Sequence, residues 1–242
     1  RPRAGRRGRP DRGRLTGRIM TADRPAAGSA APGDPFAPDE RLFGPEAFAF
    51  YVELEAHNSR DWWQAHRADY ERHVRLPLER LAAIAGERYG PAKVFRPNRD
   101  VRFSADKSPY KLNGAMTAGR VGGVYVSVSA DGLHAGGGLY EPSRAQLQRA
   151  REAIAADGPA AAELDAIVRS LEERGLELAG PFLKTAPRGF DREHPRIELL
   201  RMTHFAGLGT LPPEATMGDV DRVWRAVEPL LVWVETHAEP SI

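Results

Sequence analysis

The sequence has no cysteine, and its apolar runs are short. The lack of cysteine excludes a disulfide framework, a thiolate nucleophile and any zinc or iron–sulfur site built from Cys ligands. The longest apolar run near the C-terminus covers residues 230–234 (LLVWV), whereas a transmembrane helix needs about 20 apolar residues. We therefore expect a cytoplasmic protein without a membrane span, whose 242 residues suffice to bury a core without disulfide or metal staples.

Familiar catalytic and nucleotide-binding motifs are also missing. The seven histidines show no HExxH or other metal-ligand spacing, and neither a GxSxG elbow nor a GxGxxG or P-loop pattern occurs. The sequence thus predicts no metal site, assigns no cofactor and leaves open whether the protein is an enzyme.

Positive charge is concentrated at the N-terminus. Residues 1–19 hold eight arginines against one aspartate, a local charge of +7, so the total of +2 leaves −5 for the remainder. Arg, Ala, Gly and Pro dominate residues 1–35, a composition that cannot offset its own ordering entropy. We predict a disordered leader over residues 1–38, whose first 19 residues are upstream sequence or, alternatively, an arm for nucleic acid or an anionic surface. A folded domain follows over residues 39–239.

The body predicts a single α+β domain, with helices packed on an antiparallel sheet. Apolar residues recur at helical spacing from Phe43, and Pro45 and Pro77 are placed to begin helices. Between Val94 and Tyr140 they alternate instead, as they do in strands. Helical spacing then returns and continues almost to the C-terminus.

Local signals refine this prediction. Asp131-Gly132 is typical of a tight hairpin turn, so the strands on either side should be antiparallel neighbours. Ser143 and Gln146 have the spacing of a capping box at a helix start. Pro229 predicts a bend or restart in the last helix.

A basic segment stands out within the acidic body. Residues 95–111 (FRPNRDVRFSADKSPYK) have a local charge of +3. If Val101 and Phe103 face the core, strand alternation places Arg102 on the opposite face. The turn before Pro109 would then return the following side chains toward that same face.

Arginine forks, ammonium groups and a phenol are suited to holding a phosphate or carboxylate. We predict that the anion is bound by Arg99, Arg102, Lys107 and Lys111. The predicted orienting or acid/base groups are Asp100, Asp106 and Tyr110. Alternatively, these charges pair among themselves and pin the turn, although two carboxylates cannot neutralise five cations. A divalent ion between the two aspartates is disfavoured by the neighbouring cations.

A glycine-rich strand, residues 136–138, leads into the predicted helix start at Ser143. Backbone amides after glycines can receive an anion, so Gly137 and Gly138 join the predicted binding residues. The alternative is that these glycines allow a helix or side chain to pack closely on the sheet.

Several segments together resemble a family of bacterial and fungal proteins called domain of unknown function 2461. They are residues 57–63 (HNSRDWW), 98–104 (NRDVRFS), 106–111 (DKSPYK), 136–140 (GGGLY) and 198–201 (ELLR). The sequence departs from the family pattern at His57, usually Asn, and at Trp63, usually Phe. The resemblance implies one domain over about residues 43–237 with the basic segment as its hallmark, and it implies no activity.

The sequence therefore predicts a protein that binds an anionic, phosphate-bearing small molecule and that could also act on it. The alternative is a non-enzymatic module for nucleic acid or a protein partner, in which the basic segment is a structural salt-bridge network. The oligomeric state is not predicted.

Overall fold

The computed structural model describes residues 36–102 and 105–239, so residues 1–35 of the leader predicted over residues 1–38 lie outside this range. In chain order the elements are α1 (Pro45–Ala56), α2 (Arg60–Tyr70), the π-helix η1 (Glu71–Arg75), α3 (Leu76–Tyr89), β1 (Ala92–Val94), β2 (Asn113–Gly119), β3 (Gly123–Ser129), β4 (Gly132–Leu139), α4 (Arg144–Ala155), α5 (Pro159–Glu173), β5 (Glu177–Ala179), α6 (Ile197–Arg201), β6 (Phe205–Leu211) and α7 (Met217–Ala238).

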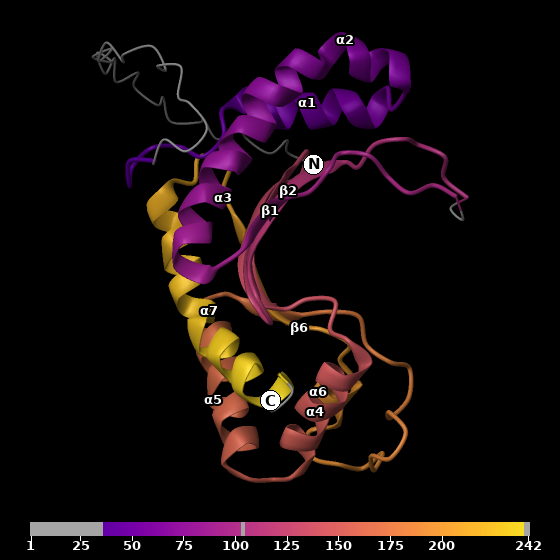
Figure 1. The fold of residues 1–242 in the computed structure, drawn as a ribbon, viewed down its shortest axis with the longest axis vertical. Helices are drawn as coiled ribbons and strands as arrows, with labels where there is room; N and C mark the ends of the chain where they lie inside the picture. The colour runs from indigo at the N-terminus through magenta and orange to yellow at the C-terminus, as the bar shows by residue number, and fades with distance from the viewer. Residues whose placement is uncertain (1–35, 103–104, 240–242) are drawn as a thin grey trace, which may run out of the picture. The chain divides into compact units, whose positions relative to one another are not determined.

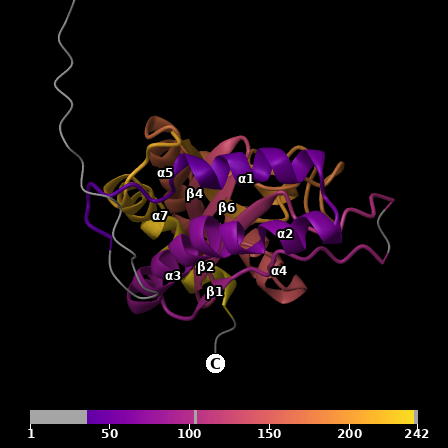
Figure 2. The ribbon, with the colours of Figure 1, turned by 90° about the horizontal axis from the view of Figure 1, so that it is seen from above.

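The strands form one antiparallel sheet of six, in the order β1-β2-β3-β4-β6-β5. The sheet is strongly curved, and helices α3 and α7 run along its convex side (Figure 1). Viewed from above, α1 and α2 lie side by side at one end of the sheet (Figure 2). The predicted α+β class with an antiparallel sheet is confirmed.

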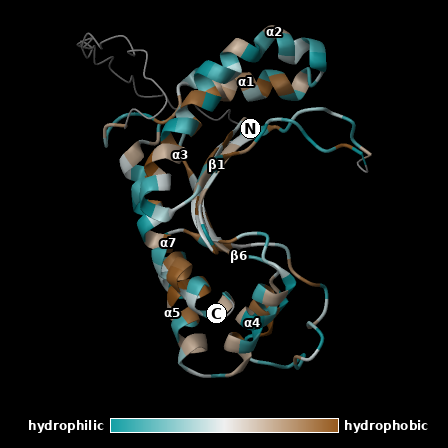
Figure 3. Ribbon diagram, in the orientation of Figure 1, coloured by the Kyte–Doolittle hydropathy of each residue, from teal (hydrophilic) through white to brown (hydrophobic). Residues whose placement is uncertain are grey.

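Strand alternation divides the sheet into a buried face and an open face. Val124, Val126 and Val128 of β3 are fully buried on the helix-covered side. Tyr125 points to the other side, where it is only partly buried. The valine face packs against α1, α3 and α7 and forms part of the apolar core of the fold. Figure 3 shows hydrophobic residues along part of α7, whereas α2 is mainly hydrophilic.

The glycines of β4 permit this packing. A Cβ on Gly137 would lie 2.9 Å from Val227 Cγ2 of α7 and 2.8 Å from the Gly123 carbonyl oxygen, closer than a methyl group can approach. The interpretation that a helix packs closely on the glycine strand is therefore confirmed for Gly137.

Two predicted local signals are also confirmed. The turn at residues 130–132 joins the antiparallel neighbours β3 and β4. The Ser143 hydroxyl accepts a hydrogen bond from the Gln146 amide, and the Gln146 side chain accepts one from the Ser143 amide, which completes the capping box of α4.

Pro77 lies in the first turn of α3, as predicted, although η1 leads into α3 with helical backbone. Two other local predictions are wrong. Pro229 does not restart the last helix, because α7 continues from Met217 to Ala238. In the part of the chain that the structure describes, residues 96–112 contain no strand, only a single bridge between Asn98 and Tyr110.

Candidate functional site

Residues 96–102 and 105–112 form the two sides of an arm between β1 and β2 that extends beyond the sheet (Figures 1 and 2). Its two sides are joined at the base by backbone hydrogen bonds from Arg99 N to Pro109 O (2.9 Å) and from Lys111 N to Pro97 O (2.8 Å). Phe103 and Ser104 lie outside the described residues, so the predicted facing of Val101 and Phe103 is not tested.

The arm is anchored to α2. The Asn58 side chain donates a hydrogen bond to the Tyr110 carbonyl (3.0 Å) and accepts one from the Tyr110 amide (3.2 Å). Ser59 caps α2 through the Trp62 amide, which fixes the helix start beside Asn58. The rings of Trp63 and Tyr110 stack, and both side chains are buried.

The predicted anion-binding arginines have partners within the arm. Arg99 pairs with Asp106, and Arg102 pairs with Asp100 at 2.7 Å. Lys107 donates a hydrogen bond from Nζ to the Val101 carbonyl (3.0 Å).

Asp106 and Asp100 also stabilise the arm. The Asp106 carboxylate also accepts a hydrogen bond from the Ser108 amide (2.8 Å). The Arg99 guanidinium and the Ser108 hydrogen bond hold the pKa of Asp106 well below its usual range. Arg102 lowers the pKa of Asp100. Both carboxyls are therefore ionised at neutral pH, each next to its arginine partner.

The sequence predicts that Tyr110 and Lys107 lie on the same face, but in the structure they do not. The Tyr110 ring is buried against Trp63, whereas Lys107 is exposed. Lys111 does turn toward the concave face of the sheet, where it lines a cavity with Gly137 and Gly138.

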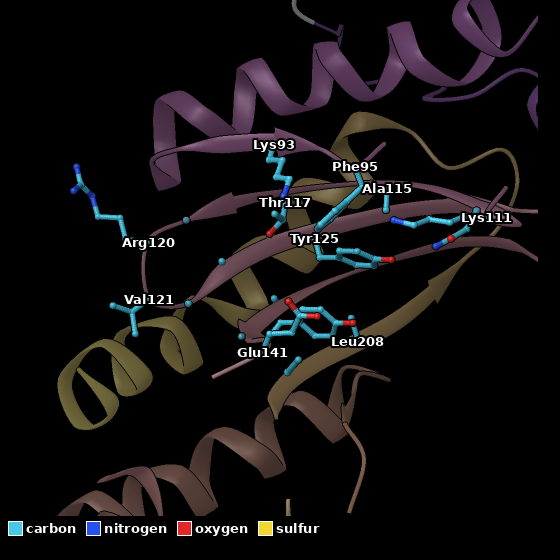
Figure 4. Close-up of a pocket in the computed structure, with 18 residues that line it drawn as sticks. Lys93, Phe95, Lys111, Ala115, Thr117, Arg120, Val121, Tyr125, Glu141 and Leu208 are labelled. Atoms are coloured by element: carbon cyan, nitrogen blue, oxygen red, sulfur yellow. The ribbon is translucent and has the colours of Figure 1, made fainter. Parts of the chain in front are cut away.

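This cavity has a volume of about 640 Å³ and follows the concave face from β1 to β6 (Figure 4). Register explains its floor, because Lys93 of β1, Thr117 of β2, Tyr125 of β3, Gly136 of β4 and Leu208 of β6 form one row across the sheet. Among the described residues, the helices with the most extensive contacts to these strands, α3 and α7, lie on the opposite face, so the polar side chains of this row remain open to a ligand.

The cavity carries a surplus of positive charge. Its lining includes three cations, Lys93, Lys111 and Arg120, and one carboxylate, Glu141. In Figure 4 the Arg120 side chain points out of the cavity. The cations that face the cavity are therefore Lys93 and Lys111. They flank the Phe95 ring, with Nζ at 5.2 Å and 5.4 Å from the ring centroid. Within residues 36–102 and 105–239 neither lysine has an ion-pair partner.

Tyr125 lies across the middle of the cavity (Figure 4). Burial raises the pKa of its phenol, while hydrogen bonding with Ser127 and Asn113 opposes the rise. The phenol is therefore protonated at neutral pH and can donate a hydrogen bond. Asn113 also lines the cavity and adds a neutral polar group.

Lys93, Phe95, Tyr125 and Glu141 were not among the predicted site residues. In the sequence Tyr125 alternates with the valines of β3, which indicates that it lies on the opposite face of the sheet from them. Its proximity to Lys93 depends on the strand order, which the sequence did not reveal.

Within the described part of the chain, no group of three His, Asp or Glu side chains is arranged to hold a metal ion. Nor does any described helix combine the length and apolar character that crossing a bilayer requires.

The comparisons give one family. A model of the family described as conserved hypothetical protein (DUF2461) matches residues 46–233, which include the arm, its anchor on α2 and the cavity. No curated protein and no solved structure matches the chain. The match covers most of the sequence, and we conclude that the chain belongs to the DUF2461 family.

Proposed function

We propose that the protein binds an organic phosphate ester in the cavity on the concave face of the sheet. The observation that carries the proposal is the pair of ammonium groups, Lys93 and Lys111, on either side of Phe95 without a carboxylate partner among the described residues. Two such cations around one aromatic ring provide point charges for a phosphate.

The size of the cavity supports an ester rather than the free ion. A volume of about 640 Å³ lies within the range of roughly 300–1,000 Å³ typical of small-molecule sites. Phe95, Tyr125 and Leu208 give the lining an apolar part that an inorganic phosphate would not use.

In this proposal the arm positions the site rather than binding the ligand through its tip. Arg99, Arg102 and Lys107 hold the arm together, with Asp106 and Asp100 as partners of the two arginines. Lys111 follows directly on the Tyr110 anchor and carries the contact with the anion. Gly138 contributes backbone to the cavity lining. Tyr125 is the group placed to donate a hydrogen bond or a proton to the bound ester.

A thermal-shift assay with alkyl phosphates tests the proposal. At about 100 times Kd a ligand stabilises the folded state by about 2.7 kcal/mol, which corresponds to a rise in Tm of about 5–10 °C for a chain of this size. Lys93→Ala and Lys111→Ala should each reduce the shift. Lys184→Ala, an exposed lysine outside the cavity, should keep it.

The absence of any stabilisation in the parent protein would refute the proposal. Salt-dependent binding of an oligonucleotide that is lost on changing Lys107 but kept on changing Lys93 would favour the nucleic-acid module instead.

A further inference from the structure

The strongest unassigned feature of the cavity is Glu141. It is the one carboxylate in the lining, and within the described residues it forms no ion pair with either cavity lysine or with any other cation. A carboxylate and two ammonium groups thus face one cavity without neutralising one another. A ligand that carried only negative charge would leave Glu141 unmatched and close to an anion.

The backbone fixes Glu141 in an uncommon conformation. Its φ is +55°, in the left-handed region, which is unfavourable for a non-glycine residue. Pro142 and the Ser143 capping box follow immediately and hold this geometry at the end of β4. A glycine at this position would relieve the strain, yet the position carries a charged side chain that lines the cavity.

The residue before Glu141 supplies an aromatic ring to the same cavity. Tyr140 lines the cavity, and 65% of its surface is exposed. Its one ring contact among the described residues is with His204, at 4.9 Å between centroids. An exposed aromatic ring and a carboxylate in one cavity are a favourable environment for an ammonium group.

The two charged ends lie on opposite sides of Tyr125 (Figure 4). Lys93 belongs to β1 and Glu141 follows β4, and β2 and β3 lie between these strands. β1 and β4 are three strand spacings apart, which is about 14 Å. Side chains extend into the cavity from both strands, so the distance that a ligand must span is shorter.

From this arrangement we propose that the ligand is zwitterionic: its phosphate group binds Lys93 and Lys111, and an ammonium group at its other end binds Glu141 and the Tyr140 ring. The inference rests on the proposed function, since it takes the phosphate end as given, and it adds the chemical class of the rest of the molecule.

Isothermal titration of the full chain with two matched esters tests the inference. The probes are 2-aminoethyl phosphate and propyl phosphate, in which a methyl group replaces the ammonium. A charged hydrogen bond of about 1.5–3 kcal/mol predicts at least about tenfold tighter binding of the amino ester. Glu141→Gln keeps a hydrogen-bond acceptor but removes the charge, and it should abolish the preference. Glu163→Gln, an exposed carboxylate of α5 outside the cavity, should retain it.

The outcomes separate the two proposals. Equal affinity of the parent protein for both esters, or a preference that survives in Glu141→Gln, overturns the zwitterion inference and leaves the phosphate site standing. Failure of both esters to bind overturns both proposals.

Discussion

The indole of Trp63 lies nearly parallel to the phenol of Tyr110, with ring centroids 4.1 Å apart and an interplanar angle of 11°. Trp63 belongs to α2 and Tyr110 to the arm, so this stack joins the first helical pair to the segment that precedes β2. Because Lys111 follows Tyr110 directly, the stack and the Asn58 hydrogen bonds fix the point from which Lys111 enters the cavity.

Asn58→Ala should lower the free energy of unfolding by about 1–3 kcal/mol, because the substitution leaves the amide and carbonyl of Tyr110 without their partner. Urea denaturation measures this change. Gln64→Ala on the exposed side of the same helix is the control and should stay within about 0.5 kcal/mol of the parent. A loss for Asn58→Ala no larger than that of the control would show that the anchor contributes nothing.

Gly137→Ala should destabilise the fold by about 1–3 kcal/mol through overpacking. The new methyl group would meet the Gly123 carbonyl oxygen at 2.8 Å and Val227 Cγ2 at 2.9 Å, and neither strand nor helix can move without disturbing the sheet. Thermal unfolding measures the effect. Gly158→Ala is the matched control, since the nearest atom to its added Cβ is 4.0 Å away. Equal stability of the two variants would contradict the close approach of α7.

Arg99→Ala should raise the pKa of Asp106 toward its ordinary value of about 3.9. The folded-state pKa is lowered, mainly by Arg99, so the stabilising contribution is present above the unfolded pKa and is lost as the pH falls through the folded one. Carboxyl NMR titration of parent and variant measures the shift. Asp100, which pairs with Arg102, should keep its lowered pKa in the variant. Titration of Asp106 near 3.9 in the parent would contradict the pairing.

Tyr125→Phe should weaken binding of an alkyl phosphate by about tenfold, the value of one hydrogen bond to a charged group. The variant also removes the hydrogen bonding of the hydroxyl with Ser127 and Asn113, so the free energy of unfolding should fall by about 1 kcal/mol. Titration calorimetry gives the affinity and urea denaturation gives the stability. Unchanged affinity would remove Tyr125 from the binding site.

Much of the fold follows from local sequence signals. The valine alternation of β3, the Asp131-Gly132 turn and the Ser143 capping box each act over a few residues, and each occurs in the structure as predicted. The restart predicted at Pro229 does not occur, because surrounding contacts outweigh a local preference. Pro229 lies within α7, whose apolar residues are buried along almost its whole length.

The candidate site was predictable only in part. The charge of residues 95–111 points to the arm, and of its predicted binding residues Lys111 lines the cavity. The arginines were proposed as anion ligands because spacing cannot show which charges pair, and Asp100 and Asp106 are close enough in sequence to reach them. Lys93 and Glu141 come together only through the strand order and curvature of the sheet, which depend on contacts distant in sequence.

The most direct test of the account is NMR shift mapping with propyl phosphate on the parent protein and on the Lys93→Ala/Lys111→Ala double variant. The account predicts that the largest shifts occur at residues of the concave face, including Phe95, Asn113 and Tyr125, and that they disappear in the double variant. Shifts centred on Arg99, Arg102 and Lys107 that persist in the double variant would contradict it and would place the anion on the arm.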